Sequence, residues 1–343
     1  MSDEQWMQRV FDLALLGQGQ VSPNPLVGCV IVDEQGAVLG EGWHQQYGQA
    51  HAEVNAVAQV TDKASIREAT VYVNLEPCSH FGKTPPCADM LVQLQPKRVV
   101  IANVDSNPLV AGQGIEKLKA AGVEITTGVL EAQGRRLNRR FFTFVEQQRP
   151  YIILKWAQTA NGWMGDTEQP SLNISNLLAR TLSHRWRTEE DAMMVGKQTA
   201  LVDNPQLDAR LWKGKNPLRI AIDRFKTLPP TLHLFDQKRP TLVYTFAPNE
   251  KRPNLQWVQL PEENFWAALW ADLHKRKVQS LIVEGGSQLL HALIQAGYWD
   301  EMRVFISAQS LAGNVRAPRQ AGQCVARVAL ENNHLEIWQK TTT

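Results

Sequence analysis

Three side chains in the first third of the sequence have the types and spacing of a metal site. His51 begins the run His51-Ala52-Glu53, Cys78 follows a proline, and eight residues separate Cys78 from Cys87. One imidazole and two thiolates leave tetrahedral zinc a fourth position for water, which is the arrangement of a catalytic site rather than a structural one. The pattern therefore predicts zinc that activates water at neutral pH.

Glu53 supplies the second component of a hydrolytic site. Zinc does not need it as a ligand, so its carboxylate can take a proton from water and return it to a departing amine. Hydrolytic deamination requires this acid/base step. The alternative is that His51 only begins a helix, Glu53 is solvated and the cysteines are small core residues. The joint pattern favours the zinc site.

The second half contains a candidate phosphate-binding turn. The apolar run Leu281-Ile282-Val283 leads into Glu284-Gly285-Gly286-Ser287, which predicts a strand, a glycine turn and the start of a helix. Backbone N–H groups at such a turn, together with the positive end of the helix, can hold a pyrophosphate. The turn lacks the full Gly-x-Gly-x-x-Gly pattern, so a tight turn without a ligand is the alternative.

The elements that must position the zinc candidates alternate between helix and strand up to about residue 145, which predicts an α/β arrangement of layers. Their periodicity predicts helices at 4–17, 51–60 and 88–94, and strands at 27–32, 38–39, 70–75 and 98–103. The helix at 88–94 connects two strands as a crossover. We therefore expect a partly parallel sheet.

A polar segment that ends in proline, 147–150, predicts a linker between a first domain at 1–147 and a second at 148–343. The second half predicts strands at 151–156, 192–195, 218–222, 241–245, 280–283 and 303–306, and helices at 177–188, 264–276 and 288–296. This alternation is typical of a doubly wound nucleotide-binding sheet.

Composition restricts the partners and the compartment. Lys plus Arg total 36 against 34 for Asp plus Glu, so we expect a small-molecule substrate, no nucleic acid and no membrane. No apolar run approaches the roughly 18 residues that span a bilayer, and the N-terminus lacks the basic region of a signal peptide. The four cysteines are too few for a secreted disulfide scaffold, and Cys29 and Cys324 carry no functional signal. We expect a cytoplasmic chain.

Several motifs closely resemble those of the bacterial bifunctional deaminase/reductases of riboflavin biosynthesis. They are Asn24-Pro25-Leu26-Val27-Gly28, His51-Ala52-Glu53-Val54, the segment from Glu76 to Cys87, the segment from Asn107 to Gly114, Lys155-Trp156-Ala157, the segments Val195 to Thr199 and Asp203 to Arg210, and the turn after Glu284. The resemblance implies a cytidine-deaminase-like α/β/α domain followed by a dihydrofolate-reductase-like doubly wound domain. It also implies one zinc ion per chain, NADPH, and a homo-oligomer, either a dimer or a tetramer.

For the first domain, the resemblance implies hydrolytic deamination of 2,5-diamino-6-(5-phosphoribosylamino)pyrimidin-4(3H)-one to 5-amino-6-(5-phosphoribosylamino)uracil. It implies that Asn24, His44 and Lys83 contact this substrate, since an amide suits a pyrimidine edge and a cation suits a phosphate. The alternatives are that Asn24 only forms a turn before a proline, and that His44 and Lys83 are ordinary exposed side chains.

For the second domain, the resemblance implies hydride transfer from NADPH to C1′ of the ribose, which opens the ring to a ribityl chain. The implied substrate contacts are Ser171, Arg187, Leu207, Arg210 and Glu284. Arginine suits a phosphate, and the alternative is that both arginines are surface residues. The implied cofactor contacts are Lys155, Ala157, Asn173, Thr199, Asp203, Gly286, Ser287, Gln288, Leu289 and Leu290.

Two departures from the family pattern concern the reductase half. Asn161 stands where the family has an aspartate, and Asn173 stands where it has a tryptophan that helps to cover the cofactor. A deaminase with an impaired reductase domain is therefore an alternative function.

Two further alternatives remain at this point. A nucleoside or nucleic-acid deaminase with a C-terminal binding module predicts a basic channel with stacking aromatic residues, which the balanced charge disfavours. A binding protein with a structural zinc ion needs a fourth ligand, and His80 is the one close candidate in sequence.

Overall fold

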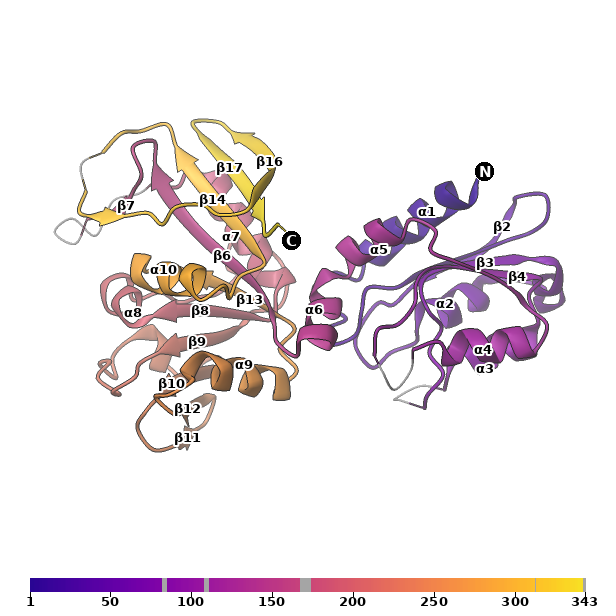
Figure 1. Ribbon diagram of the computed structural model, residues 1–343, viewed down its shortest axis with the longest axis horizontal. Helices are drawn as coiled ribbons and strands as arrows, with labels where there is room; N and C mark the ends of the chain where they lie inside the picture. Colours follow the sequence, from indigo (N-terminus) through magenta and orange to yellow (C-terminus); the bar gives the residue numbers. More distant parts are fainter. Residues whose placement is uncertain (82–84, 108–110, 167–173, 312, 342–343) are drawn as a thin grey trace. The chain divides into compact units, whose positions relative to one another are not determined.

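A computed structural model describes residues 1–81, 85–107, 111–166, 174–311 and 313–341. Lys83, Ser171 and Asn173 lie outside the described residues. The chain forms two compact units, Met1–Gln148 and Arg149–Thr343, and each consists of a sheet with helices packed against it (Figure 1).

The first unit contains, in its described residues, a mixed sheet of five strands in the order β2-β1-β3-β4-β5. The strand β1 pairs antiparallel with β2 and with β3, whereas β3, β4 and β5 run parallel. This confirms the predicted partly parallel sheet. The strands are β1 (Gly28–Val32), β2 (Val38–Trp43), β3 (Thr70–Leu75), β4 (Arg98–Asn103) and β5 (Glu124–Thr127).

Helices cover both faces of this sheet because successive strand residues point to opposite sides. Cys29 and Ile31 pack with α2, α3 and α4 on one face, whereas Val30 and Val32 pack with α1 on the other. The helices are α1 (Asp3–Leu15), α2 (Ala52–Gln59), the 3-10 helix η1 (Lys63–Glu68), α3 (Cys87–Leu94), α4 (Gln113–Ala120), α5 (Glu131–Leu137) and α6 (Arg139–Gln147). The predicted helices of the first half are confirmed.

The second unit contains a ten-stranded sheet in the order β11-β12-β10-β9-β8-β13-β6-β14-β17-β16, within the part of the chain that the structure describes. The strands from β12 to β14 in this order are parallel, and the three outer strands are antiparallel. A short ribbon pairs β7 with β15. The strands are β6 (Tyr151–Thr159), β7 (Trp163–Gly165), β8 (Ala192–Gly196), β9 (Leu218–Ile222), β10 (Thr241–Thr245), β11 (Glu250–Arg252), β12 (Leu255–Gln259), β13 (Ser280–Glu284), β14 (Glu301–Ser307), β15 (Val315–Arg316), β16 (Gln323–Leu330) and β17 (Asn333–Gln339).

Helices on both faces confirm the predicted doubly wound α/β arrangement of this unit. Residues of α7 and α8 pack with Ile153 and Met193 on one face, and residues of α9 and α10 pack with Ile152 and Met194 on the other. The helices are α7 (Leu177–Glu189), α8 (Lys197–Asp203), the 3-10 helix η2 (His233–Phe235), α9 (Phe265–Lys275) and α10 (Ser287–Gln295).

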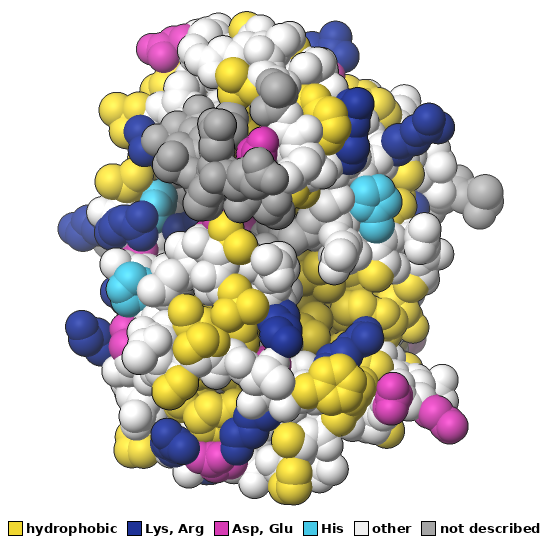
Figure 2. Space-filling model, turned by 90° about the vertical axis from the view of Figure 1, so that its left-hand side faces the viewer, with side chains coloured by type: hydrophobic (Ala, Val, Ile, Leu, Met, Phe, Trp, Pro, Cys, Tyr) yellow, Lys and Arg dark blue, Asp and Glu magenta, His cyan; other side chains and the backbone are white. Residues whose placement is uncertain are grey.

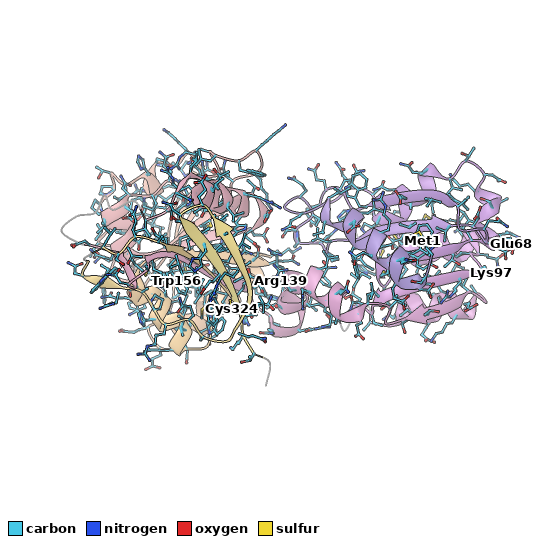
Figure 3. The ribbon with its side chains drawn as sticks, turned by 90° about the horizontal axis from the view of Figure 1, so that it is seen from above. Met1, Glu68, Lys97, Arg139, Trp156 and Cys324 are labelled. Atoms are coloured by element: carbon cyan, nitrogen blue, oxygen red, sulfur yellow. The ribbon has the colours of Figure 1, made fainter. Side chains whose placement is uncertain are left out.

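The antiparallel strands β16 and β17 were not among the predicted elements. The hairpin extends the parallel sheet beyond β14, and its outer strand β16 carries Cys324 (Figure 3), whereas Trp156 of β6 is buried inside the unit. Within the described residues, no helix combines the length and the apolar character needed to cross a bilayer.

Candidate active sites

His51, Cys78 and Cys87 come together in the first unit. His51 is the residue before α2, Cys78 lies in the loop after β3, and Cys87 is the first residue of α3. The His51 Nδ1 atom lies 3.5 Å from Cys78 Sγ and 3.4 Å from Cys87 Sγ. Tetrahedral zinc with ordinary Zn–S and Zn–N bonds separates such N and S atoms by roughly 3.5 Å. The three side chains therefore fit zinc.

The local backbone favours thiolates at this cluster. The Cys87 N–H, at the start of α3, donates to Cys78 Sγ at 3.3 Å. A hydrogen bond from the Cys87 side chain lowers the pKa of the Cys78 thiol against the effect of burial, and His51 adds to the lowering. Among the described residues the cluster contains no fourth His, Cys, Asp or Glu ligand, and His80 is exposed and outside it. The geometry is that of an open metal site.

The Glu53 carboxylate lies beside the three candidate metal ligands. Glu53 is the second residue of α2, its exposed fraction is 3%, and its side chain contacts the Cys87 thiol. Burial, together with the nearby Cys78 charge, raises the pKa of Glu53 to about 7. A carboxyl group with a pKa near neutrality can both accept and donate a proton.

Asn24 and His44 form a hydrogen-bonded pair near the cluster. His44 Nδ1 lies 3.0 Å from the Ala50 carbonyl oxygen, and Asn24 Nδ2 lies 3.1 Å from His44 Nε2. The carbonyl can only accept, so Nδ1 carries the proton, Nε2 accepts from the Asn24 amide, and the Asn24 oxygen remains an acceptor. Burial lowers the pKa of His44, which keeps this neutral form. With an exposed fraction of 2%, His44 is not an ordinary exposed side chain.

Glu76 is a positioning residue of this site that the sequence analysis missed. It directly precedes Pro77-Cys78, and its buried carboxylate accepts from the backbone N–H groups of Asp105 at 3.2 Å, Gly112 at 3.0 Å, Gly114 at 2.9 Å and Ile115 at 3.3 Å. The carboxylate thus ties the start of α4 to the cysteine loop. The available signal was an acidic residue immediately before the Pro-Cys motif.

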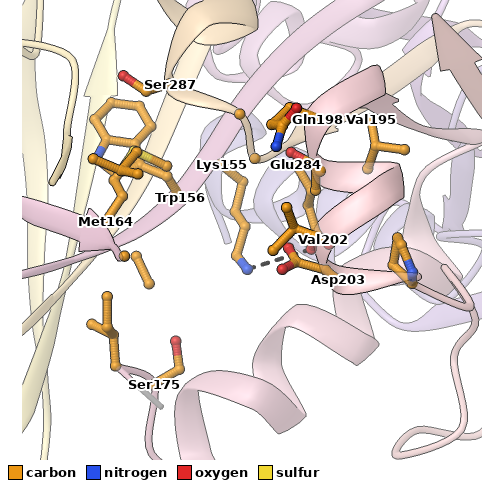
Figure 4. A pocket seen from close by; sticks show the side chains of 18 of the residues that line it. Lys155, Trp156, Met164, Ser175, Val195, Gln198, Val202, Asp203, Glu284 and Ser287 are labelled. Atoms are coloured by element: carbon orange, nitrogen blue, oxygen red, sulfur yellow. Dashed lines mark ion pairs between the residues drawn. The ribbon is translucent and has the colours of Figure 1, made fainter. Parts of the chain in front are cut away.

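A pocket of about 420 Å³ opens in the second unit at the carboxyl ends of β6, β8 and β13. At its centre Lys155 Nζ lies 3.4 Å from a Glu284 carboxylate oxygen, and Figure 4 shows this ion pair. Ligands of doubly wound sheets bind at such strand ends. The lining residues are Lys155, Trp156, Ala157, Met164, Gly165, Asp166, Ile174, Ser175, Arg180, Val195, Gln198, Thr199, Val202, Asp203, Pro205, Leu207, Glu284, Gly285, Gly286, Ser287 and Val315.

Two consecutive glycines form the turn between β13 and α10. Gly285 and Gly286 have φ values of +79° and +66°, which residues other than glycine rarely adopt. A Cβ atom at Gly286 would lie 3.1 Å from Thr199 Oγ1. The absence of side chains therefore leaves backbone close to the pocket at the positive end of α10, a geometry that suits a phosphate.

Not all of the predicted reductase residues line the pocket. Arg187 donates to the Asp208 carbonyl at 2.8 Å and to Glu284 at 2.8 Å, and its side chain is 12% exposed, which disfavours the surface alternative for this residue. Arg210 pairs with Asp208 at 2.5 Å and is 56% exposed. Leu290 is fully buried in the core, Leu289 packs against the core, and neither they nor Gln288 line the pocket.

Asn161 has a structural role in the second unit. Its amide donates to the Leu311 carbonyl at 3.0 Å and accepts from the Thr159 hydroxyl at 2.7 Å. A carboxylate could not donate the first of these bonds. The side chain does not line the pocket, so the departure from the family's aspartate removes no charge from it.

Arg180 lines the pocket and was also missed. It lies seven residues before Arg187 on α7, which places both on one helical face. The predicted helix at 177–188 already contained both arginines, so their common face could have been predicted from this spacing.

Comparisons with known proteins assign a family to each half of the chain. The family described as "Cytidine and deoxycytidylate deaminase zinc-binding region" matches residues 1–103, and "RibD C-terminal domain" matches residues 150–341. The chain is 40% identical to "Riboflavin biosynthesis protein RibD" of Aquifex aeolicus, over 89% of this chain and 86% of that protein. It is 35% identical to the Escherichia coli protein of the same name, over 92% and 90%.

Solved structures show the same relationship. A crystal structure of a diaminohydroxyphosphoribosylaminopyrimidine deaminase/5-amino-6-(5-phosphoribosylamino)uracil reductase from Thermotoga maritima superimposes with a TM-score of 0.90, at 32% identity over 99% of both chains. Acinetobacter baumannii RibD superimposes with a TM-score of 0.88, at 31% identity over 99% of both chains. The chain therefore belongs to the RibD family of riboflavin biosynthesis proteins, which join a zinc-dependent deaminase to a reductase.

Proposed function

We propose that the first unit deaminates diaminohydroxyphosphoribosylaminopyrimidine and that the second reduces 5-amino-6-(5-phosphoribosylamino)uracil with NADPH. These are the activities named for the Thermotoga maritima relative. The observation that carries the proposal is the open cluster of His51, Cys78 and Cys87 with the buried Glu53 carboxylate beside it.

In the deaminase unit, His51, Cys78 and Cys87 would hold the zinc ion, which when bound supplies Lewis-acid activation of water. Glu53 then moves the proton, from the water to the departing amino group, at its carboxylate oxygens. The short turn from His51 to Glu53 places the carboxylate beside the ligands rather than among them.

Asn24 orients the pyrimidine in this proposal. The Ala50 carbonyl holds His44 in the tautomer that accepts from the Asn24 amide. Asn24 is thereby left with its oxygen available to an N–H of the substrate. Lys83, outside the described residues, remains a predicted contact.

In the reductase unit, NADPH supplies the hydride when bound. The turn at Gly285 and Gly286, with Thr199 behind it, would hold the cofactor's phosphates. Lys155 and Glu284 sit at the centre of the pocket, where their hydrogen bonds would orient the ribose that accepts the hydride. Trp156 and Met164, which also line the pocket, help to exclude water.

The decisive test is one coupled assay on the full chain, which measures ammonia release from the diaminopyrimidine and then loss of NADPH absorbance. We expect Glu53→Gln to retain stoichiometric zinc and to lower ammonia release by about 100-fold or more, the usual contribution of general acid/base catalysis. The same variant should still oxidise NADPH when supplied with the deaminated product.

The matched control is Glu116→Gln, which removes the same charge at a side chain that is 71% exposed. It should release ammonia at the wild-type rate. Full ammonia release by Glu53→Gln would exclude the acid/base role, and wild-type protein that oxidises no NADPH with the deaminated product would exclude the proposed reduction.

A further inference from the structure

A second cavity opens in the second unit beside the reductase pocket. Its volume is about 600 Å³, and its walls come from α10, from the end of β6 with the turn that follows, and from the segment that begins in β15. The described residues that line it are Gln158, Gly162, His291, Ile294, Gln295, Arg316, Ala317, Pro318, Arg319 and Gln320. None of these lines the reductase pocket. The proposed reduction therefore gives this second cavity no role.

The wall between the two cavities contains β15 and the start of α10. Val315 lines the reductase pocket, whereas Arg316, the next residue of β15, lines the second cavity, because successive strand residues point to opposite sides. On α10, Ser287 lines the reductase pocket and His291, one turn later, lines the second cavity. The Ser287 hydroxyl donates to the Arg316 carbonyl oxygen at 2.5 Å. The two cavities are therefore separate sites with a common wall.

The charged side chains that the structure describes around the second cavity are basic. Arg316 and Arg319 line it, and no Asp or Glu does so among the described residues. Arg319 is exposed, and its guanidinium forms neither an ion pair nor a side-chain hydrogen bond within the part of the chain that the structure describes. Its N–H donors are therefore available to an anion.

Arg316 is held in a fixed orientation at this cavity. Its Cζ atom lies 3.7 Å from the centroid of the Trp163 ring, and Nη1 donates to the Asn161 carbonyl oxygen at 3.0 Å. Stacking engages one face of the guanidinium, whereas Nε and Nη2 have no hydrogen-bond partner among the described residues. A planar guanidinium that is already oriented loses little side-chain entropy when it binds an oxyanion.

His291 offers a different kind of group to a ligand. Its Nδ1 atom lies 2.8 Å from the Ser287 carbonyl oxygen, which can only accept, so Nδ1 carries a proton. In the neutral ring Nε2 is then an acceptor, and it has no partner among the described residues. A ligand that carries both an oxyanion and a hydroxyl group would satisfy the two arginines and this nitrogen.

The volume and the distribution of charge favour a small molecule over a polymer. A volume of about 600 Å³ falls within the range of small-molecule pockets, roughly 300–1,000 Å³. Nucleic-acid binding requires basic side chains that gather along one surface. On the face that Figure 2 shows, the basic side chains are instead spread among acidic and apolar ones.

We propose that the second cavity binds a small phosphate ester, with the phosphate on Arg316 and Arg319 and a hydroxyl group of the ester on His291 Nε2. The donors of a guanidinium match phosphate oxygens in geometry as well as in charge. The assignment depends on neither of the proposed activities, because it uses none of the residues that carry them. It gives the second unit a ligand site in addition to the reductase pocket.

Calorimetric titration of the full chain with glycerol 3-phosphate tests this site. We expect saturable binding, and Arg319→Ala should raise Kd by about 10- to 100-fold, the loss of a charge-assisted hydrogen bond. Arg319→Lys should recover part of the affinity. The matched control is Arg327→Ala, which removes the same charge from a side chain that is 68% exposed and does not line the cavity. Its Kd should stay within about twofold of wild type.

Three further ligands test the chemistry of the site. Glycerate, which has a carboxylate in place of the phosphate, should bind more weakly than glycerol 3-phosphate, and glycerol should not bind. His291→Ala should weaken the binding of glycerol 3-phosphate but not that of methyl phosphate, because methyl phosphate has no hydroxyl group on its carbon for Nε2 to accept from.

The inference is overturned if wild-type protein shows no saturable binding of glycerol 3-phosphate, or if Arg319→Ala binds it within about twofold of wild type. It is also overturned if Arg327→Ala shows the same loss, since the effect would then be one of net charge. Glycerate that binds as tightly as glycerol 3-phosphate would assign the cavity to carboxylates instead. Binding of glycerol 3-phosphate elsewhere in the chain would not respond to Arg319→Ala.

Discussion

Substituting Glu284 by glutamine removes the negative charge that lies between two cations of the reductase pocket. The Glu284 carboxylate lies 2.8 Å from Arg187 and 3.4 Å from Lys155, and its side chain is 15% exposed. Burial alone would raise the pKa of Glu284, but Arg187 first, and then Lys155, outweigh burial and lower it to about 2 from the ordinary value of 4.5.

The pKa shift sets the size of the expected effect. Since one pKa unit corresponds to about 1.4 kcal/mol, the ionised carboxylate stabilises the folded unit by about 3 kcal/mol at pH 7. Removal of one partner from a buried ion pair typically costs about 3–5 kcal/mol, a range that includes this value. Glu284→Gln should therefore lower the free energy of unfolding of the second unit by about 3 kcal/mol at neutral pH.

The pH dependence has a definite sign. Because the folded-state pKa is depressed, the stabilisation is fully present above the ordinary pKa of 4.5 and is lost as the pH falls toward 2. The difference between wild type and Glu284→Gln should be constant from pH 6 to pH 8. It should be smaller by about a quarter at pH 4, where protonation of the unfolded chain has begun.

Urea unfolding followed by tryptophan fluorescence measures this difference in the full chain. All of the 11 tryptophans except Trp6 and Trp43 belong to the second unit, so the signal reports mainly on its unfolding. The control is Glu262→Gln, which removes the same charge from an exposed position and should change stability by less than about 0.5 kcal/mol. If Glu284→Gln lowers the free energy of unfolding by less than about 1 kcal/mol at pH 7, the carboxylate is not the charge that stabilises Arg187 and Lys155.

Two further substitutions test positioning in each unit. Glu76→Gln replaces two acceptor oxygens by one, although four backbone N–H groups donate to this side chain. We therefore expect the variant to lose zinc to a chelator more readily and to release ammonia about 10-fold or more slowly. Zinc content and turnover equal to wild type would contradict this role. Arg219→Lys should lower the free energy of unfolding of the second unit by about 3 kcal/mol in urea, because one ammonium group cannot reach all the acceptors of the fully buried guanidinium. A decrease below about 1 kcal/mol would refute this prediction. Those acceptors are Thr241 Oγ1, the His233 carbonyl, Asp236 Oδ1 and the Arg239 carbonyl.

The strongly periodic elements were predictable from the sequence, and the less regular ones were not. The crossover from β3 through α3 to β4 followed from β-branched runs on either side of a helical segment. The hairpin of β16 and β17 was missed because β16 is an outer strand with a largely exposed face. A strand with little buried surface lacks the alternation of apolar and polar residues by which strands are recognised in a sequence.

The zinc cluster illustrates what residue types alone can determine. His51, Cys78 and Cys87 were predicted together because metal ligands and a nearby carboxylate are chemically distinctive. Glu76 was missed, since its role depends on backbone N–H groups from residues near 105–115 that only folding brings to it. The same holds for the tautomer of His44, which the Ala50 carbonyl determines.

The sequence by itself determined the two α/β units and the glycine turn after β13, and it predicted the metal cluster with Glu53, because each depends on neighbours in the chain or on distinctive chemistry. Only the tertiary structure decided which partners the cations of the second unit have. Arg187 is bound to Glu284 and Arg210 to Asp208, whereas Arg180 forms no ion pair within the described residues. A side chain's charge is a property of its residue type, but its availability depends on partners that the chain brings near it by folding.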